Sequence, residues 1–255
     1  MMLNLKDIRI IEDIRELQAI PKGKCVINCI NAHSYNIAQK DFIFSKALTY
    51  SDYLIPDGAS IIMACKWLKT KNKPQKRITG WDLFFLEMNE LQSEVINGEY
   101  QAQHGKEKKP TIMFMGSSEK VLDMIKNRMK KDFPLFNVYT YSPPYKPVFS
   151  DEDNKTIIET INHVQPDLLW IGMTAPKQEK WVYEHWNDLD INCHVGCIGA
   201  VFDFYAGTIK RAPQWWLDHS MEWVYRLIKE PKRMWKRYLL GNPLFLYNVF
   251  KEWIK

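Results

Sequence analysis

The sequence predicts an α/β protein, a Rossmann-like parallel sheet with helices on both faces, followed by a helical C-terminal segment. Short apolar runs alternate with segments of helical periodicity between residues 24 and 198, as in successive strand–helix units of a parallel sheet. Beyond Gly207 the pattern changes to helical segments interrupted at Pro213, Pro231 and Pro243. We therefore expect two domains, a Rossmann-like core over residues 1–206 and a basic, Trp-rich helical appendage over residues 207–255.

The elements follow one another in a regular order. Strands are expected at 24–30, 54–56, 111–115, 168–173 and 193–198, and helices at 34–51, 59–68, 119–132, 151–163 and 176–186. Residues 92–110 are polar and are expected to form a solvated loop. Ligands of such sheets bind at the carboxyl ends of the strands. The residues just past the apolar runs are Asn31, Asp57, Gly116, Thr174 and Gly199.

Composition limits the class of protein. Hydrophobic residues make up 46% of the chain and charged residues 25%, which is typical of a globular protein and not of a disordered one. The N-terminus has no uninterrupted apolar segment of the signal-peptide kind, so we expect the five cysteines to be free thiols in a reducing cytoplasm. No window reaches the roughly 20 apolar residues of a spanning helix. If the protein meets a membrane, we expect it to lie on the surface.

The charge is concentrated in the C-terminal segment. Residues 207–255 contain ten Lys and Arg against four acidic residues, a net charge of +6, whereas the remainder of the chain carries −1. The same segment holds five of the ten tryptophans. Cationic side chains attract phosphate, and tryptophan favours the lipid headgroup boundary. Nucleic acid is an alternative partner, because it also binds basic and aromatic side chains. The rest of the chain contains no recognised nucleic-acid-binding module, so we expect no nucleic-acid partner.

Asp57 lies in the sequence IPDGAS, at the end of an expected strand and before an expected helix. One interpretation is an N-cap aspartate beside a turn glycine, which is the commoner case. The other is a carboxylate at the ligand edge of the sheet that acts as a general base toward a hydroxyl.

Two strand–turn–helix segments are candidate anion sites. In WIGMTAPKQEKW, residues 170–181, Pro176 suits a first helical turn and places Gln178 near the helix N-terminus, where an anion is favoured. A helix start with a polar surface is the simpler alternative, and the same two interpretations apply to Gly116-Ser117-Ser118. Neither GxGxxG nor GxxxxGK[ST] occurs in the chain.

No metal site or cofactor is expected. Asp188 and Asp190 form an acid-x-acid pattern, but they precede an expected strand and are expected to be solvated, and residues 151–153 suit the acidic first turn of a helix. Cys193 and Cys197, with His194 between them, lack a second ligand pair at zinc spacing. His33 lies near the expected site, where a packing role is as probable as a catalytic one.

In the C-terminal segment, Arg226, Arg233 and Arg237 recur at spacings of seven and four and share one helix face if the helix continues or restarts at Pro231. Guanidinium groups match the geometry of a diphosphate. A solvated basic face is the simpler alternative. Four interleaved aromatic residues favour an anionic, apolar partner instead: Trp223, Tyr225, Trp235 and Tyr238.

Seven segments in order resemble the WecG/TagA/CpsF glycosyltransferases of bacterial surface polysaccharides. They cover nearly the whole chain from about residue 20: INAHS at 30–34, IPDGASI at 55–61, KRITGWDLF at 76–84, MGSSEKV at 115–121, PDLLWIGMTAPKQEKWV at 166–182, GCIGAVFDFYAGTIKRAPQWW at 196–216 and EWVYRLIKEPKRMWKRYLLGNPLFL at 222–246. Any one segment could arise by chance, whereas seven in order are highly specific.

The resemblance implies an inverting, metal-independent transfer of a sugar from a UDP-sugar to a polyprenyl-diphosphate-linked saccharide. The enzyme would be peripheral, on the cytoplasmic face of the plasma membrane, with a C-terminal appendage that closes the site and touches the membrane. The oligomeric state stays open, a homo-oligomer included.

The resemblance also implies roles for individual residues. Asp57 matches the general base, and Arg226, Arg233 and either Lys236 or Arg237 match a cationic cluster that stabilises the departing UDP. The matching substrate-binding residues are Asn31, Arg77 and Gln178, with Cys29 where the family often has Thr. The candidate UDP-binding residues are Gly116, Ser117, Gly172, Gly199 and Asp203.

The sequence departs from the family pattern around the last of these. GCIGAVFDF stands where GVGGSFDF is usual, although Asp203 is retained. The donor sugar is therefore left open between an N-acetylmannosamine type and a glucose type.

Two other classes of protein remain as alternatives. The first is a non-catalytic nucleotide-binding module that docks anionic lipid or RNA through the basic C-terminal segment. The second is a nucleotide-sugar epimerase or dehydrogenase, which the lack of GxGxxG and of a YxxxK pair within the Rossmann-like core, residues 1–206, disfavours.

Overall fold

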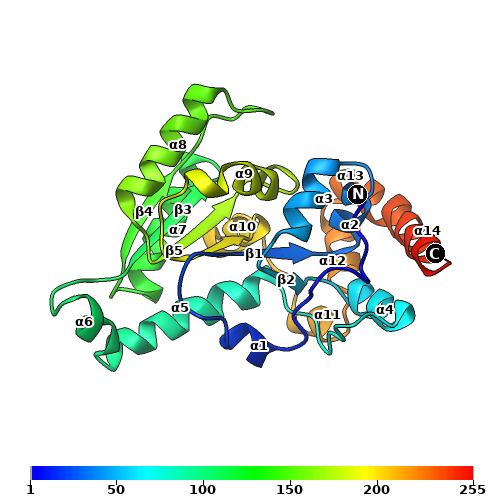
Figure 1. Ribbon diagram of the computed structural model, residues 1–255, viewed down its shortest axis with the longest axis horizontal. Helices are drawn as coiled ribbons and strands as arrows, with labels where there is room; N and C mark the ends of the chain where they lie inside the picture. The colour runs from blue at the N-terminus through cyan, green and yellow to red at the C-terminus, as the bar shows by residue number, and fades with distance from the viewer. Residues whose placement is uncertain (1, 255) are drawn as a thin grey trace. The chain divides into compact units, whose positions relative to one another are not determined.

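The computed structural model describes residues 2–254, which fall into two compact units (Figure 1). Unit 1 is assembled from three segments, Met1–Leu17, Asn28–Thr79 and Lys210–Lys255. Unit 2 comprises Gln18–Ile27 and Gly80–Ile209. Each unit therefore depends on residues that are distant in the sequence.

A six-stranded parallel sheet, in the order β2-β1-β6-β5-β3-β4, confirms the expected Rossmann-like α/β class. The strands are β1 Cys25–Ile30, β2 Tyr53–Pro56, β3 Thr111–Gly116, β4 Asn137–Tyr141, β5 Leu168–Gly172 and β6 His194–Cys197. The five expected strands are all present, and β4 is additional. Strand β4 lies at the sheet edge with no fully buried residue, so it lacks the apolar run by which the other strands were predicted.

Two helices of unit 2 begin at serine residues that cap them. Ser118 accepts a hydrogen bond from the Val121 amide at the start of α7, and Ser150 forms a capping box with Asp153 at the start of α8. The helices are α5 Gly80–Ile96, α6 Glu99–His104, α7 Glu119–Asp132, α8 Asp151–Val164, α9 Lys177–His185 and α10 Ala200–Ala206, with a 3₁₀ turn at Trp186–Asp188.

The expected solvated loop at 92–110 is wrong in its first part. Helix α5 continues to Ile96, and α6 follows from Glu99 to His104. Tyr100 of α6 is buried, and its hydroxyl donates to the Asp167 carboxylate at 3.1 Å. One buried aromatic residue therefore anchors a helix whose other side chains are polar except for Ala102, which is why composition alone predicted a loop.

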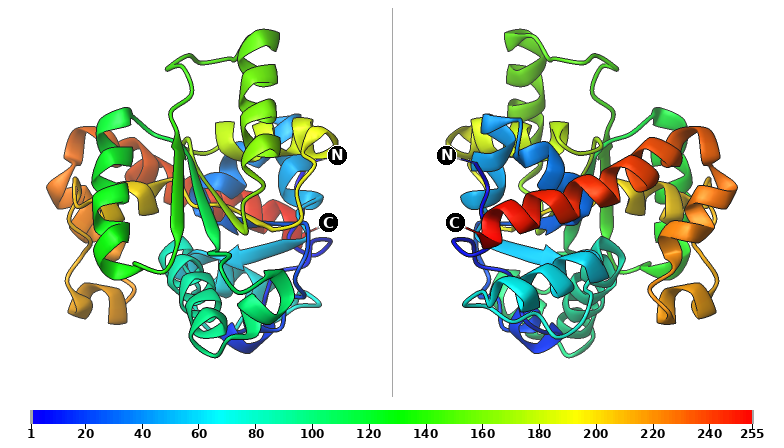
Figure 2. Two further views of the ribbon diagram at one scale, coloured as in Figure 1. Left: turned by 90° about the vertical axis from the view of Figure 1, so that its left-hand side faces the viewer. Right: turned by 90° about the vertical axis from the view of Figure 1, so that its right-hand side faces the viewer.

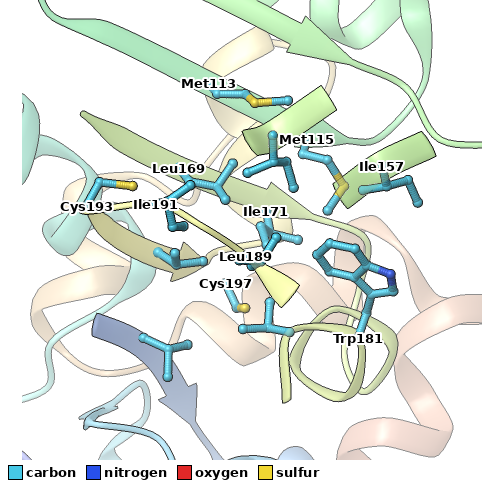
Figure 3. Packing of buried hydrophobic residues seen from close by; sticks show 14 of the residues in the cluster. Met113, Met115, Ile157, Leu169, Ile171, Trp181, Leu189, Ile191, Cys193 and Cys197 are labelled. Atoms are coloured by element: carbon cyan, nitrogen blue, oxygen red, sulfur yellow. The ribbon is translucent and has the colours of Figure 1, made fainter. Parts of the chain in front are cut away.

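The core of unit 2 is a layer of aliphatic and sulfur-containing side chains between the sheet and its helices (Figure 3). Met113 and Met115 of β3 and Leu169 and Ile171 of β5 contribute from the sheet, and Trp181 contributes from α9. All five are nearly inaccessible to solvent. This packing fixes the carboxyl ends of β3 and β5, where the following loops begin.

A buried charge pair lies at the other end of β6. The Nδ1 atom of His194 is 3.0 Å from both carboxylate oxygens of Glu87, and its Nε2 atom is 3.0 Å from the carbonyl oxygen of Pro21. Burial alone would lower the pKa of His194, but hydrogen bonds with Cys25 and Glu87 outweigh it and raise this pKa to about 11. His194 is therefore a charged structural residue.

Unit 1 consists mainly of helices from both ends of the chain. They are α1 Ile14–Gln18, α2 Ala32–Ala38, α3 Phe42–Thr49, α4 Ala59–Leu68, α11 Gln214–Asp218, α12 Glu222–Lys229, α13 Pro231–Trp235 and α14 Gly241–Trp253, with a π-helical turn at Lys236–Leu240. The single helix expected over 34–51 is two helices, because Asp41 leaves the helical conformation and caps α3.

Helix α14, the long C-terminal helix of Figure 2, packs against α2 and α4. Phe245 and Val249 are buried, and the Glu252 carboxylate accepts hydrogen bonds from the Tyr35 hydroxyl at 2.6 Å and the Lys6 amide at 3.0 Å. The expected break at Pro243 is wrong, since helical backbone continues from α13 through the π-helical turn and across this residue into α14.

No helix in the part of the chain that the structure describes is long and apolar enough to cross a bilayer. Residues 210–255 group with two N-terminal segments in unit 1. A boundary between a core and a membrane-associating appendage at residue 207 stays a prediction.

Candidate active site

Asp57 is held at the carboxyl end of β2 by backbone hydrogen bonds. Its amide donates to the Ile30 carbonyl at 2.9 Å, and the Ile78 amide donates to the Pro56 carbonyl at 3.1 Å. The N-cap of α4 is Gly58, and no side chain caps this helix. The N-cap interpretation of Asp57 is therefore wrong.

Arg77 is brought beside Asp57 by the same backbone contacts, because it directly precedes Ile78. Its Nη1 atom lies 3.1 Å from a carboxylate oxygen of Glu222, the first residue of α12. Both side chains are mostly buried, with 19% and 16% of their surface exposed. An ion pair at this depth interacts more strongly than one on the surface, because less water screens it.

Two further guanidinium groups, Arg226 on α12 and Arg237 in the π-helical turn, act electrostatically on Asp57. Both residues are partly buried. Burial lowers the pKa of Arg237, and its Nε atom is buried without a hydrogen-bond partner among the described residues. Together with Arg77, they set three positive charges against the two carboxylates Asp57 and Glu222.

The Asp57 carboxyl titrates near neutral pH. Removal of water by the surrounding protein is the largest cause, and the charge of Glu222 adds to it, whereas Arg77, Arg237 and Arg226 act in the opposite direction. The net result raises its pKa to about 7. A carboxylate with such a pKa is a stronger base than an ordinary aspartate, yet it is still largely ionised just above neutrality.

His33 is uncharged at neutral pH. Burial is the main cause and the nearby charge of Arg237 the second, and together they lower its pKa to about 4. A neutral imidazole near Arg237 adds no charge to the cluster.

Asn31 lies next to the same strand end. Its side-chain oxygen accepts from the amides of His33 and Ser34 at 3.0 Å each and so caps α2. A Cβ atom at Gly58 would lie 3.7 Å from that of Asn31, which places Asn31 beside the Asp57 loop. Cys29, on β1, is partly exposed and is not in a disulfide.

Arg233 and Lys236 are more exposed than Arg226 and Arg237, although the charge of Arg233 still acts on Arg237. Arg233 is exposed and pairs with Glu230 at 2.7 Å, and Lys236 is exposed with its ammonium group over the Trp235 ring. Of the two alternatives at the end of the expected cationic cluster, Arg237 is the one whose charge reaches Asp57.

The remaining candidates lie in unit 2. Gln178 is 4% exposed, and its amide is used internally: the oxygen accepts from the Met173 amide at 3.2 Å, and the nitrogen donates to Glu179 at 2.9 Å. Burial raises the pKa of Glu179 to about 7. Gln178 therefore shapes the loop between β5 and α9.

The glycines at these strand ends have packing reasons to be glycine. A Cβ at Gly116 would lie 2.8 Å from the Gly172 backbone, one at Gly172 would lie 2.6 Å from the Phe202 ring, and one at Gly199 would lie 3.0 Å from Gln178. Ser117 and Thr174 both have φ of 65°, a strained conformation for residues with a side chain. Strain at two adjacent strand ends is typical of a ligand-binding edge.

Asp203 is in the first turn of α10, where its carboxylate accepts from the Thr208 hydroxyl at 3.1 Å. Residues 2–254 contain no group of three or more His, Cys, Asp or Glu side chains arranged to hold a metal ion. The absence of a metal requirement stays a prediction.

Glu222 is the residue that the sequence did not identify. In the sequence it is one acid in a basic segment. Its only signal is the spacing of four to Arg226, which puts both on one face of α12. Its pairing with Arg77 depends on a contact across 145 residues, which periodicity cannot reveal.

The parallel sheet defines the class as a Rossmann-like α/β protein, and a near-neutral carboxyl lies among guanidinium groups at one end of its strands. Comparison with known proteins gives the family. A model of the "Glycosyl transferase WecG/TagA/CpsF family" matches residues 3–255, and the chain belongs to this family. The expected resemblance is thereby confirmed, and the protein is a glycosyltransferase.

Curated relatives carry a common name. The chain is 30% identical over 227 residues, 89% of this chain and 79% of the relative, to an N-acetylglucosaminyldiphosphoundecaprenol N-acetyl-beta-D-mannosaminyltransferase of Bacillus subtilis (strain 168). A protein of that name from Staphylococcus aureus (strain MW2) is 24% identical over 221 residues, 87% of this chain and 78% of the relative.

Proposed function

We propose that this protein transfers a sugar from a UDP-sugar, with inversion, to a polyprenyl-diphosphate-linked saccharide at a membrane surface. The observation that carries the proposal is the Asp57 carboxyl, with its pKa of about 7, held among Arg77, Arg226 and Arg237. The relatives, whose name describes a transferase acting on N-acetylglucosaminyldiphosphoundecaprenol, support the acceptor class. The donor sugar is of the N-acetylmannosamine or glucose type.

The proposed chemistry is a single displacement. Asp57 removes the proton of an acceptor hydroxyl as its oxygen attacks the anomeric carbon of the donor. The bond between this carbon and the diphosphate oxygen breaks, and its electron pair leaves with UDP. Attack from the side opposite the leaving group inverts the anomeric centre.

The guanidinium groups would stabilise the leaving group. Three positive charges against two carboxylates leave an excess that favours an anion, and protonation of Asp57 during the reaction increases the excess. Buried, preorganised cations can offset the charge that develops on a diphosphate, a role that Mg²⁺ has in other enzymes.

A membrane surface is the proposed meeting place with the acceptor. Trp215, Trp223, Trp235 and Trp253 are each at least 40% exposed, as are Leu239 and Leu240, and the cationic residues Lys232, Arg233 and Lys236 lie between them in the sequence. Exposed tryptophan beside lysine and arginine suits the headgroup region of an anionic bilayer. Sedimentation with phosphatidylglycerol vesicles should retain the protein, and neutral vesicles at high salt should not.

The test of the activity uses purified protein, a panel of UDP-sugars and a synthetic lipid-diphosphate-linked N-acetylglucosamine acceptor, with UDP release and product mass as readouts. Turnover should appear with at least one donor and fall to background in Asp57→Asn. Asp123→Asn, which removes an exposed acid on α7, is the matched control and should retain activity. UDP binding without turnover would instead support the non-catalytic binding module.

A further inference from the structure

Glu222 is a charged residue that no role in the proposed chemistry accounts for. It lies at the first position of α12, where a carboxylate interacts favourably with the helix N-terminus. It is also mostly buried and forms the ion pair with Arg77 described above. A lone ion pair of this depth costs desolvation energy, so its position beside a candidate base needs an explanation.

We propose that Glu222 is a positioning residue, which holds Arg77 in place and keeps a second carboxylate next to Asp57. This inference rests on the proposed role of Asp57 as general base. The geometry connects all three residues: the Ile78–Pro56 hydrogen bond sets Arg77 beside Asp57, and Arg77 binds Glu222 at 3.1 Å. Arg77 thus interacts with two carboxylates, those of Asp57 and Glu222.

The consequence is electrostatic. Arg77, Arg226 and Arg237 all lower the pKa of Asp57, and His33 contributes no charge at neutral pH. Burial and Glu222 act against these three cations, and Glu222 is the only anion among the causes. Without it, Asp57 would ionise more easily and would be a weaker base toward a sugar hydroxyl.

The same pair organises the cation cluster. Glu222 and Arg226 are one turn apart on α12, so an Arg77 fixed on Glu222 has a defined position relative to Arg226. Glu222 would therefore influence both the base and the groups that receive the leaving diphosphate.

The pH dependence of kcat/KM tests the inference, with the full chain, a UDP-sugar donor and the lipid-linked acceptor. In the wild type, activity should rise with pH through a limb near 7, because Asp57 must be ionised to act as a base. Glu222→Gln keeps an oxygen that accepts from Arg77 but removes the charge. Its limb should move to lower pH, on the order of one pH unit for the loss of a like charge, and its plateau rate should be lower.

Two further variants separate positioning from folding. Asp218→Asn removes one negative charge from exposed α11, where the side chain only accepts from Gln214, and should leave the limb unchanged. Glu222→Asp, which retains the charge, should restore the limb toward the wild-type position. Circular dichroism and the thermal midpoint check that each variant is folded.

The outcomes distinguish this inference from the proposed function. If wild type turns over, Asp57→Asn does not, and folded Glu222→Gln keeps the wild-type limb, then the inference on Glu222 is overturned while the general base stands. If Asp57→Asn is as active as wild type, the proposed base itself is wrong. A limb that shifts in Glu222→Gln but not in Asp218→Asn supports the inference.

Discussion

Replacing Gly172 by alanine decides between two explanations of this glycine. The resemblance predicts that Gly172 contacts UDP, whereas the structure gives it a packing role at the end of β5. A Cβ at this position would lie 2.6 Å from the Phe202 ring. Carbon atoms in contact are ordinarily about 3.5–4.0 Å apart, so the ring would have to move by roughly 1 Å.

The ring has little room to move. Phe202 is 1% exposed and packs edge-on against Phe114, with ring centroids 5.5 Å apart. Overpacking of a dense core costs about 1–3 kcal/mol. For a chain of this size, a loss of 2 kcal/mol lowers the thermal midpoint by about 4–8 °C.

Calorimetric unfolding and titration with UDP measure the two effects separately. Gly172→Ala should lower the midpoint. In the double variant Gly172→Ala/Phe202→Leu, the two losses should be less than additive, because leucine vacates the space that the new methyl group needs. Gly241→Ala is the control, since the nearest atom to a Cβ there would be the Lys236 carbonyl oxygen at 3.7 Å, an ordinary contact, and the change should not destabilise the protein. An unchanged midpoint with weakened UDP binding would refute the packing explanation.

Three further outcomes are expected. The stability that His194 gains from its raised pKa is complete below its unfolded value of about 6.5 and is lost as pH rises toward 11, so Glu87→Gln should flatten the decline in thermal midpoint between pH 7 and 10. Arg237→Ala should lower kcat on the order of 10²-fold, as expected for loss of a buried cation at a developing charge. Lys236→Ala should lower kcat much less, because its ammonium group is exposed. Equal losses in the two variants would contradict the assignment of Arg237, and not Lys236, to the cation cluster. Turnover should persist in EDTA. If EDTA abolished turnover and added Mg²⁺ restored it, the metal-independent mechanism would be contradicted.

The fold was largely predictable because buried strands of a parallel sheet have continuous apolar sequences. The strands around 24–30, 111–115 and 168–173 are buried on both faces and were predicted within a residue or two. Strand β4 and helix α6 were not, since one lies at a half-exposed edge and the other is anchored by Tyr100 alone.

The residues of the candidate site were predictable only where their position follows from the neighbouring sequence. Asp57 follows a strand and precedes a helix, so its place at the sheet edge could be inferred from the chain order. Glu222 could not be inferred, because its partner Arg77 is 145 residues away. Equally, the spacing of Arg226, Arg233 and Arg237 could not show that Arg233 is exposed and paired with Glu230.

The three-segment composition of unit 1 has a consequence for synthesis of the protein. Asp57 and Arg77 leave the ribosome long before Glu222, Arg226 and Arg237, and the Lys6–Glu252 hydrogen bond joins residues 246 positions apart. Domains tend to fold as they are made, and unit 2 is complete by residue 209. A nascent chain of that length contains all six strands of the sheet but no cation cluster, so the proposed active site is assembled only in the last stage of translation.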